Sequence, residues 1–66
     1  MVYKIKEIRE KRGLTQEELS VKSGVSRATI WALERNEGKV TTTKTLFNLA
    51  NALNVSVDDL FLNLND

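Results

Sequence analysis

The sequence contains no cysteine, no histidine and no proline, and these absences exclude several kinds of protein. Without cysteine there is no disulfide framework, as is ordinary for a cytosolic protein. Nothing beside Ser20, Ser23 or Ser26 resembles the base and orienting group of a nucleophilic site, so no catalytic residue is expected and an enzyme is not predicted. Asp58 and Asp59 lack the further ligands that a metal site requires. We therefore expect no metal, no other cofactor and no small-molecule ligand.

Long apolar stretches are missing as well. No apolar run approaches the roughly 18 residues of a membrane span, and no signal peptide is recognisable, so we expect a cytoplasmic protein without a membrane partner. The 66 residues predict a single domain over residues 1–66. A domain of this size buries only about 60 % of the surface of its unfolded chain. Its one core predicts a free energy of unfolding of about 3–5 kcal/mol.

The net charge is close to zero, but the charges are unevenly distributed along the chain. Residues 1–44 carry all ten lysines and arginines against six acids, a net charge of +4, whereas residues 45–66 carry three acids and no base, a net charge of −3. This asymmetry favours electrostatic steering of the basic part onto a polyanion. The alternative is that it arises by chance from solvated helix faces.

The most informative segment is residues 15–35, TQEELSVKSGVSRATIWALER, in which one helical pattern stops at Gly24 and another starts after it. Glycine suits a position of positive φ between two helices because it has no Cβ. Thr15 is a predicted N-cap, and Glu18 completes a capping box with it. Ser26 is the predicted N-cap of the second helix. Two short helices joined in this way predict a helix-turn-helix, whose second helix can enter a DNA major groove.

Three further amphipathic helices are predicted around this segment. Gly13 is expected to end the first of them, and Asn54 is expected to end the fourth helix of the chain in a left-handed conformation. With no strand pattern, repeat or low-complexity tract, the predicted fold class is all-α, a bundle of five helices. The predicted limits of the three helices are about Tyr3 to Arg12, Thr42 or Thr43 to about Leu53, and Ser56 or the next residue onward.

Charged residues occupy two helix faces that should otherwise be apolar. Arg9 and Arg12 lie on the apolar stripe of the first helix, and Glu34 shares a face with Ile30 and Leu33. Charges that face a core are tolerated only when they are paired. We therefore predict a structural ion pair between Arg9 and Glu34, the alternative being that both side chains bend out to water.

A set of short motifs runs through nearly the whole chain. The set comprises Ile8-Arg9, residues 13–19 (GLTQEEL), Gly24-Val25-Ser26, Thr29-Ile30, Leu33-Glu34, Leu49-Ala50, Ala52-Leu53 and residues 55–58 (VSVD). Together these motifs closely resemble the Cro/C1-type, XRE-like helix-turn-helix family of phage repressors and bacterial regulators, over about residues 3–62. The resemblance implies a compact, five-helix, lambda-repressor-like domain that binds double-stranded DNA. It also implies a homodimer on a partly palindromic operator.

By this resemblance, bases are read by Arg27, Ala28 and Ala32 on the side of the second helix that faces away from Ile30 and Leu33. The guanidinium of Arg27 can pair bidentately with guanine, unless it contacts only phosphate. The two alanines can touch thymine methyl groups, or they are simple helix formers. Because Arg27 is the one polar side chain among these three residues, part of the specificity for a DNA sequence is expected to come from DNA shape.

Further residues are expected to contact the DNA backbone or to brace the recognition helix. The resemblance gives both roles to Gln16, whose alternative is a solvated side chain. Trp31 stands at a position that is commonly polar in the family, and it either donates its Nε1–H to a phosphate or packs over the preceding helix or the following loop. Residues 41–43, three threonines, depart from the usual proline-containing pattern and predict a less rigid loop. The full set is Thr15, Gln16, Ser26, Thr29, Trp31, Arg35, Asn36, Lys39, Thr42, Thr43 and Lys44.

The C-terminal residues 57–64 hold more apolar side chains than one short helix can bury. Related domains often dimerise through this region, so Leu60, Leu62 and Leu64 are the expected dimer contacts, unless they complete the core of the monomer. A two-fold dimer of this kind places its recognition helices on half-sites about 10–10.5 bp apart.

The favoured interpretation is a stand-alone, sequence-specific transcriptional regulator, a repressor that occupies an operator. Phage-type repressors and restriction–modification controllers share this minimal layout. The alternative is an antitoxin or co-regulator that uses the same fold mainly for protein–protein interaction, through Val21, Trp31 and the apolar C-terminus.

Overall fold

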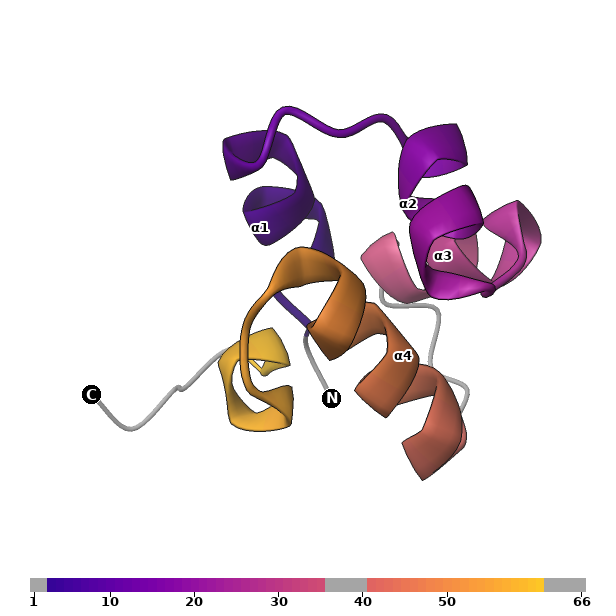
Figure 1. Cartoon of the computed structure of the whole chain (residues 1–66). Coiled ribbons are helices and arrows are strands. Elements are labelled where there is room, and N and C mark those ends of the chain that lie inside the picture. Colours follow the sequence, from indigo (N-terminus) through magenta and orange to yellow (C-terminus); the bar gives the residue numbers. More distant parts are fainter. Residues whose placement is uncertain (1–2, 36–40, 62–66) are drawn as a thin grey trace.

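The computed structural model of the chain describes residues 3–35 and 41–61, and within them it contains four α-helices and one 3₁₀ helix (Figure 1). The all-α class is thereby confirmed, although the last of the five elements is a 3₁₀ turn rather than an α-helix. None of the helices among the described residues has the length and apolar content that crossing a membrane requires. In chain order the elements are α1 (Ile5–Lys11), α2 (Gln16–Ser23), α3 (Arg27–Glu34), α4 (Thr43–Leu53) and η1 (Val57–Leu60).

Side-chain caps start four of these elements, at the predicted residues. The Oγ1 of Thr15 accepts a hydrogen bond from the backbone N–H of Glu18 at 3.0 Å, and the Glu18 carboxylate accepts one from the Thr15 backbone at 2.9 Å, so the capping box is confirmed. Ser26 and Thr42 cap α3 and α4 through a single side-chain bond each, and Ser56 caps η1 within a second capping box. Each cap satisfies backbone donors that the first turn leaves without partners.

Left-handed residues stand at the ends of α2 and α4 and just beyond the end of α1, where the sequence predicted helix ends. Gly13, Gly24 and Asn54 have φ angles of 71°, 72° and 59°. Gly24 is the C-cap of α2, and it turns the chain so that only three residues separate the end of α2 from the start of α3. Figure 1 shows α3 lying directly beside α2, as a helix-turn-helix requires.

The first helix is shorter than predicted. The backbone N–H of Lys4 donates to the carbonyl of Leu60 at 2.7 Å, and Tyr3 forms an isolated antiparallel bridge with Phe61, with their rings 5.3 Å apart. These contacts hold residues 3 and 4 against the end of η1, so α1 begins at Ile5. A prediction from local periodicity could not include this contact because its partner lies more than fifty residues away in the sequence.

The core consists of ten apolar side chains, and every element contributes at least one of them. Helix α4 packs against both α2 and η1. Arg12, predicted to share the apolar stripe of α1, does not face this core. It is exposed, and its Nε donates to the carbonyl of Leu53 at the end of α4, at 3.0 Å. The core residues are Ile5, Leu19, Val25, Ile30, Leu33, Leu46, Leu49, Ala50, Leu53 and Leu60.

Candidate nucleic-acid interface

The outward face of α3 is the candidate recognition surface. Arg27, Ala28, Trp31 and Arg35 are exposed, while Ile30 and Leu33 are buried on the opposite side, as a helical period of 3.6 residues requires. The exposed face therefore carries two guanidinium groups, one indole and one methyl group. Ala32 is half-buried, so it lies at the edge of this face rather than pointing directly away from the core as predicted.

The first turn of α3 is held by hydroxyl groups. The Oγ of Ser26 accepts from the backbone N–H of Thr29 at 3.2 Å and donates to the Thr29 Oγ1 at 2.9 Å. Both side chains are thus engaged in the cap. The cap fixes the backbone of the first turn, from which the side chains of Arg27 and Ala28 project. A fixed first turn matters because the N-terminal residues of a recognition helix are the ones that meet base edges.

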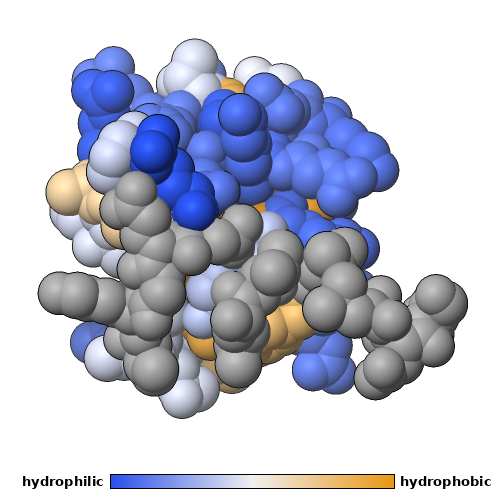
Figure 2. All heavy atoms as spheres, turned by 180° about the vertical axis from the view of Figure 1, so that it is seen from behind, coloured by the Kyte–Doolittle hydropathy of each residue, from blue (hydrophilic) through white to orange (hydrophobic). Residues whose placement is uncertain are grey.

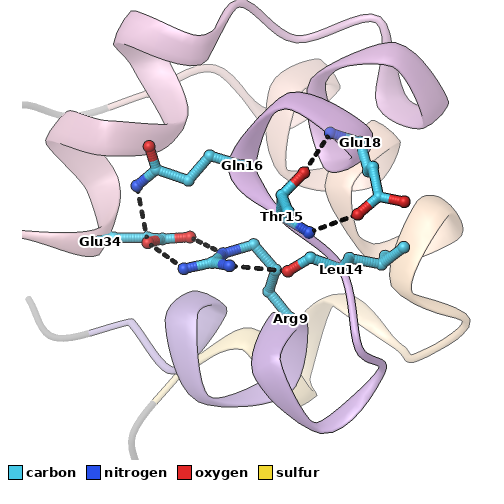
Figure 3. A network of polar contacts seen from close by, with 6 residues as sticks. All are labelled: Arg9, Leu14, Thr15, Gln16, Glu18 and Glu34. Atoms are coloured by element: carbon cyan, nitrogen blue, oxygen red, sulfur yellow. Dashed lines mark hydrogen bonds and ion pairs between the residues drawn. The ribbon is translucent and has the colours of Figure 1, made fainter.

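An ion pair ties the end of α3 to α1, and the sequence predicted both partners. The Nε of Arg9 lies 2.7 Å from the Oε2 of Glu34, and its Nη2 donates to the Oε1 at 3.1 Å, a bidentate arrangement (Figure 3). The side chains are 11 % and 3 % exposed, so both charges are largely removed from water. The hydrogen bond with Glu34 raises the pKa of Arg9 above its ordinary value, although burial opposes this shift.

Two further hydrogen bonds extend this pair to α2. The Nη1 of Arg9 donates to the backbone carbonyl of Leu14 at 2.7 Å, and the Nε2 of Gln16 donates to the Oε1 of Glu34 at 3.0 Å. Figure 3 shows Arg9, Gln16 and Glu34 converging from three helices. No side-chain pattern could have indicated the contact to Leu14, because its acceptor is a backbone group that every residue carries. The network fixes the position of α3 relative to the start of α2.

Thr15, Gln16 and Arg27 line one shallow, open recess between the end of α1 and the beginnings of α2 and α3. The Arg9 guanidinium lies at the same recess, and its charge is balanced by Glu34. The N-termini of α2 and α3 therefore open on the same side of the molecule. Seen from behind, the upper part of the described surface is formed almost entirely by hydrophilic residues (Figure 2).

The start of α4 supplies the other predicted backbone contacts. Thr42, Thr43 and Lys44 are all exposed there. The Thr42 hydroxyl accepts from the backbone N–H of Thr45 at 3.1 Å and donates to its Oγ1 at 3.0 Å, so it acts as a cap. The predicted contacts Asn36 and Lys39 lie outside the described residues.

Trp31, predicted either to contact a phosphate or to pack over the preceding helix or the following loop, is in contact with Arg35. Its side chain is about half exposed, at 48 %, and the Cζ of Arg35 lies over its ring at 4.6 Å from the centroid. The indole therefore packs against a cation of its own helix, on the outward face of α3. The i to i+4 spacing of the two residues is the sequence signal that could have indicated this pair.

One predicted dimer contact is wrong. Leu60 is completely buried in the core of the monomer, where it packs between α4 and the start of the chain, so its side chain cannot reach a second copy. Leu62 and Leu64 lie outside the described residues. Among those described, the large apolar side chains that are exposed are Val21, Trp31 and Phe47, the last of which sequence reasoning had overlooked.

A capped helix, a left-handed glycine turn and a second helix with an exposed basic face define a helix-turn-helix DNA-binding domain. A family model described as helix-turn-helix matches residues 5–60, and the chain belongs to this family, of the Cro/C1 type that its motifs resemble. An HTH-type transcriptional regulator of Archaeoglobus fulgidus is 43 % identical over 60 residues, 89 % of this chain and 83 % of the relative.

A solved structure shows the same fold. The restriction-modification controller protein C.AhdI of Aeromonas hydrophila superimposes with a TM-score of 0.81 and is 31 % identical, over 88 % of this chain and 86 % of that one. The lambda-repressor-like architecture is thereby confirmed. Membership of this family makes the chain a DNA-binding transcriptional regulator.

Proposed function

We propose that this chain is a single-domain, sequence-specific repressor that binds a partly palindromic operator as a homodimer. The observation that carries the proposal is the outward face of α3, where Arg27 and Ala28 are exposed at a capped helix start and the helix end is held by Glu34. A recognition helix must be rigidly held, because misplacing it by a fraction of an ångström breaks hydrogen bonds to base edges.

Base reading rests mainly on Arg27. Its guanidinium can donate two hydrogen bonds to O6 and N7 of one guanine, a pattern that no other base pair offers in the major groove. Ala28 has a methyl group that can contact a thymine methyl, and its small size lets the helix approach the groove floor closely. Ala32, at the edge of the same face, contributes a second small apolar surface. The remaining specificity comes from the shape of the duplex.

Phosphate groups are bound where helix N-termini open toward the DNA. The starts of α2 and α4 present backbone N–H groups together with Thr15, Gln16, Thr43 and Lys44, and the positive end of each helix dipole favours an anion. Such contacts set the register of the protein on the duplex without reading its sequence. The other members of the proposed backbone or bracing set are Ser26, Thr29, Trp31, Arg35, Asn36, Lys39 and Thr42.

The proposed dimer uses Leu62 and Leu64, without Leu60. A two-fold arrangement makes the contact isologous and turns the two recognition helices toward half-sites about 10–10.5 bp apart. Occupation of an operator by such a dimer blocks access of polymerase, which is the basis of the proposed repressor role.

A binding measurement on duplex DNA tests this function. Duplexes are first selected from a randomised library with the wild-type protein, and the affinity for the selected duplex is then measured by fluorescence anisotropy at several salt concentrations. With about six phosphate contacts per dimer, the affinity should fall by about a thousandfold between 50 and 200 mM salt. Absence of binding at low salt, or binding that salt does not change, would contradict the proposal.

Arg27→Ala tests the base-reading role. It should weaken binding to the selected duplex by about 1–3 kcal/mol and relax the preference at one base pair per half-site. Lys22→Ala is the charge-matched control, because Lys22 lines a different recess, between α2 and the end of α4. Equal weakening by Arg27→Ala on all sequences would instead make Arg27 a phosphate contact.

One observation favours a second candidate function, an antitoxin or co-regulator that mainly binds another protein. Val21 is 80 % exposed on α2, and an aliphatic side chain so placed suits a protein contact. The selection experiment separates the two functions, since a protein-binding module enriches no duplex sequence. A selected duplex with a steep salt dependence would exclude this candidate as the main function.

A further inference from the structure

Trp31 lies in the middle of the exposed face of α3. At 100° per residue, Arg27, Ala28, Trp31 and Arg35 fall within an arc of about 100°, and all four are exposed. Trp31 lies inside this arc, about 40° from Arg27 at one edge and about 60° from Ala28 at the other. Ala32, by contrast, is half-buried. The middle of the face is thus occupied by an indole, and Ala32 lies at its margin.

The placement of the indole is not explained by a role in the core. The core positions of α3 are filled by Ile30 and Leu33, which are 0 % and 5 % exposed, whereas the Trp31 side chain is 48 % exposed. The Cζ of Arg35 lies over the ring, 4.6 Å from its centroid, and the rest of the indole faces solvent. An indole that served only the core would have to point to the other side of the helix. Its exposed apolar surface is therefore placed for a partner, a role in which tryptophan is especially frequent.

The charge on this helix favours a polyanion as that partner. Arg27 is exposed one helical turn before Trp31. The one acid of α3 is Glu34, whose side chain is 3 % exposed and lies 2.7 Å from the Nε of Arg9. The helix therefore presents the indole next to an exposed cation and without an exposed carboxylate of its own. Such a surface is complementary to DNA rather than to an acidic protein surface.

The apolar group that DNA offers in the major groove is the C5-methyl group of thymine. Base edges otherwise present hydrogen-bond donors and acceptors there, and aromatic side chains are among those that contact this methyl group. A side chain in the middle of the exposed face points toward the base edges when the helix lies in the groove, whereas side chains at the margins meet phosphates. Ala28, one turn before Trp31, is small enough to let the ring approach.

The spacing along α3 limits where this thymine can lie. Trp31 follows Arg27 by four residues, which corresponds to a rise of about 6 Å along the helix. Successive base pairs are about 3.4 Å apart, so the two side chains reach positions separated by no more than about two base pairs.

We infer that Trp31 is a specificity-determining residue, whose indole contacts the C5-methyl group of a thymine within about two base pairs of the guanine read by Arg27. This inference rests on the DNA-binding function proposed above. It adds one apolar base contact to the readout by Arg27 and the two alanines, and it gives Trp31 a role beyond backbone contact or bracing.

Replacing single thymines of the selected duplex tests the inference. Each thymine of the half-site is exchanged in turn for deoxyuridine, which pairs in the same way and lacks only the methyl group, and affinities are measured by anisotropy. The wild-type protein should lose about fourfold in affinity per half-site at one thymine, the value for one apolar carbon group returned to water. That thymine should lie within about two base pairs of the position at which Arg27→Ala relaxes the preference.

The same duplexes are then titrated with Trp31→Ala. This variant should bind the thymine duplex at least about fourfold more weakly per half-site, and it should not distinguish thymine from deoxyuridine at the position concerned. Trp31→Phe should retain part of the discrimination, and Trp31→Gln should lose it. Circular dichroism and unfolding midpoints show that each variant is folded. Phe47→Ala is the matched control, because it removes another exposed aromatic ring, 56 % exposed on α4, and should leave the thymine pattern unchanged.

Several results would overturn the inference. A selected half-site without a thymine within about two base pairs of the guanine excludes the proposed contact, and so does a Trp31→Ala protein that keeps the full sensitivity to every thymine methyl group. If Trp31→Ala instead reduces the steepness of the salt dependence by about 0.9 per protomer and keeps that sensitivity, the indole contacts a phosphate. These outcomes leave the proposed function intact, whereas a wild-type protein that enriches no duplex defeats the function and the inference together.

Discussion

Arg9 carries a charge into a small hydrophobic core, where it makes three hydrogen bonds, two to the Glu34 carboxylate and one to the carbonyl of Leu14. A buried pair of this kind adds little net stability over an apolar replacement, but the loss of one partner leaves an uncompensated charge. The Arg9–Glu34 pair instead serves to position the helix end. Glu34 is the last residue of the recognition helix, so the pair and Gln16 together fix the end of that helix against α1 and α2.

Replacing Glu34 by Gln should therefore strongly destabilise the fold. The Arg9 charge loses its counter-charge, and we expect the free energy of unfolding to fall by about 3 kcal/mol, most of what a domain of this size has. The measurement is chemical denaturation followed by circular dichroism. In a double-mutant cycle with Arg9→Met and Glu34→Met, the coupling energy should be about 1–3 kcal/mol.

The exposed ion pair of Glu7 and Lys11 in α1 provides the control. Its charged atoms are 3.9 Å apart and its side chains are 56 % and 75 % exposed, so Glu7→Gln should change stability by less than about 0.5 kcal/mol. A coupling energy near zero between Arg9 and Glu34 would show that their contact does not hold α3.

Specific capping residues mark where the helices begin and end. The helices α2, α3 and α4 each begin at a Thr or Ser cap, and α2 and α4 end at a left-handed residue. These contacts join residues close in sequence, which is why the sequence predicted them. The capping box of α2 also makes the stability of that helix depend on pH.

Glu18 is the group that makes this dependence testable. The hydrogen bond from the backbone N–H of Thr15, together with the Thr15 side chain, lowers the pKa of the Glu18 carboxyl below 4.5, its ordinary value. A group whose pKa is lowered by folding contributes stability above its unfolded pKa and loses that contribution as pH falls through the folded pKa. Glu18→Gln should thus have a lower unfolding midpoint than wild type near neutral pH, and the difference should close as pH falls below 4.5.

Thermal unfolding monitored over this pH range provides the measurement. Glu17→Gln makes the same change of charge in the same turn without touching the capping box. A difference between wild type and Glu18→Gln that stays constant down to the lowest pH would show that the Glu18 charge plays no part in the cap.

The left-handed C-caps of α2 and α4 are occupied by different residues, Gly24 and Asn54. At Gly24 a Cβ would meet no atom within 4 Å, so Gly24→Ala tests backbone strain alone at a φ of 72°. We expect a loss of about 1–2 kcal/mol in the free energy of unfolding. Asn54→Gly, at the corresponding end of α4, should leave stability unchanged or raise it slightly, because glycine adopts the same φ without strain. An unaffected Gly24→Ala protein would mean that the turn does not require a left-handed residue.

On the scale of the whole molecule, the short C-terminal element closes the core. Leu60 from η1 is completely buried, and its carbonyl accepts a hydrogen bond from Lys4 near the start of the chain. The two ends of the described chain are thereby joined, and the isolated bridge between Tyr3 and Phe61 adds to this contact. The described parts of the basic N-terminal two thirds and of the acidic C-terminal third thus pack together.

Leu60→Ala should consequently destabilise the monomer. Removing a fully buried leucine side chain costs about 2–5 kcal/mol through lost burial and the cavity left behind. The unfolding midpoint in denaturant should drop by a similar amount at low and at high protein concentration. A loss that grows as the protein is diluted would instead assign Leu60 to a dimer interface.

Features that depend on near neighbours and on helical periodicity could be predicted from the sequence. The caps at Thr15, Ser26 and Thr42 and the left-handed turn at Gly24 follow from contacts within a few residues, and the apolar stripes select the core face of each helix. The pairing of Arg9 with Glu34 was also predictable, because a charge on a core face needs an opposite charge and one was available.

Contacts whose partners are distant in the sequence, or are backbone groups, could not be predicted before the chain was seen folded. The backbone hydrogen bond from Lys4 to Leu60 accounts for the later start of α1. Arg12 donates to the carbonyl of Leu53 instead of facing the core with the apolar residues of α1. The carbonyl of Leu14 accepts the third hydrogen bond of Arg9. Every residue has such a carbonyl, so no sequence pattern marks the one that will be used. For the same reason Leu60 was equally suited to a dimer contact and to the core until folding placed it inside.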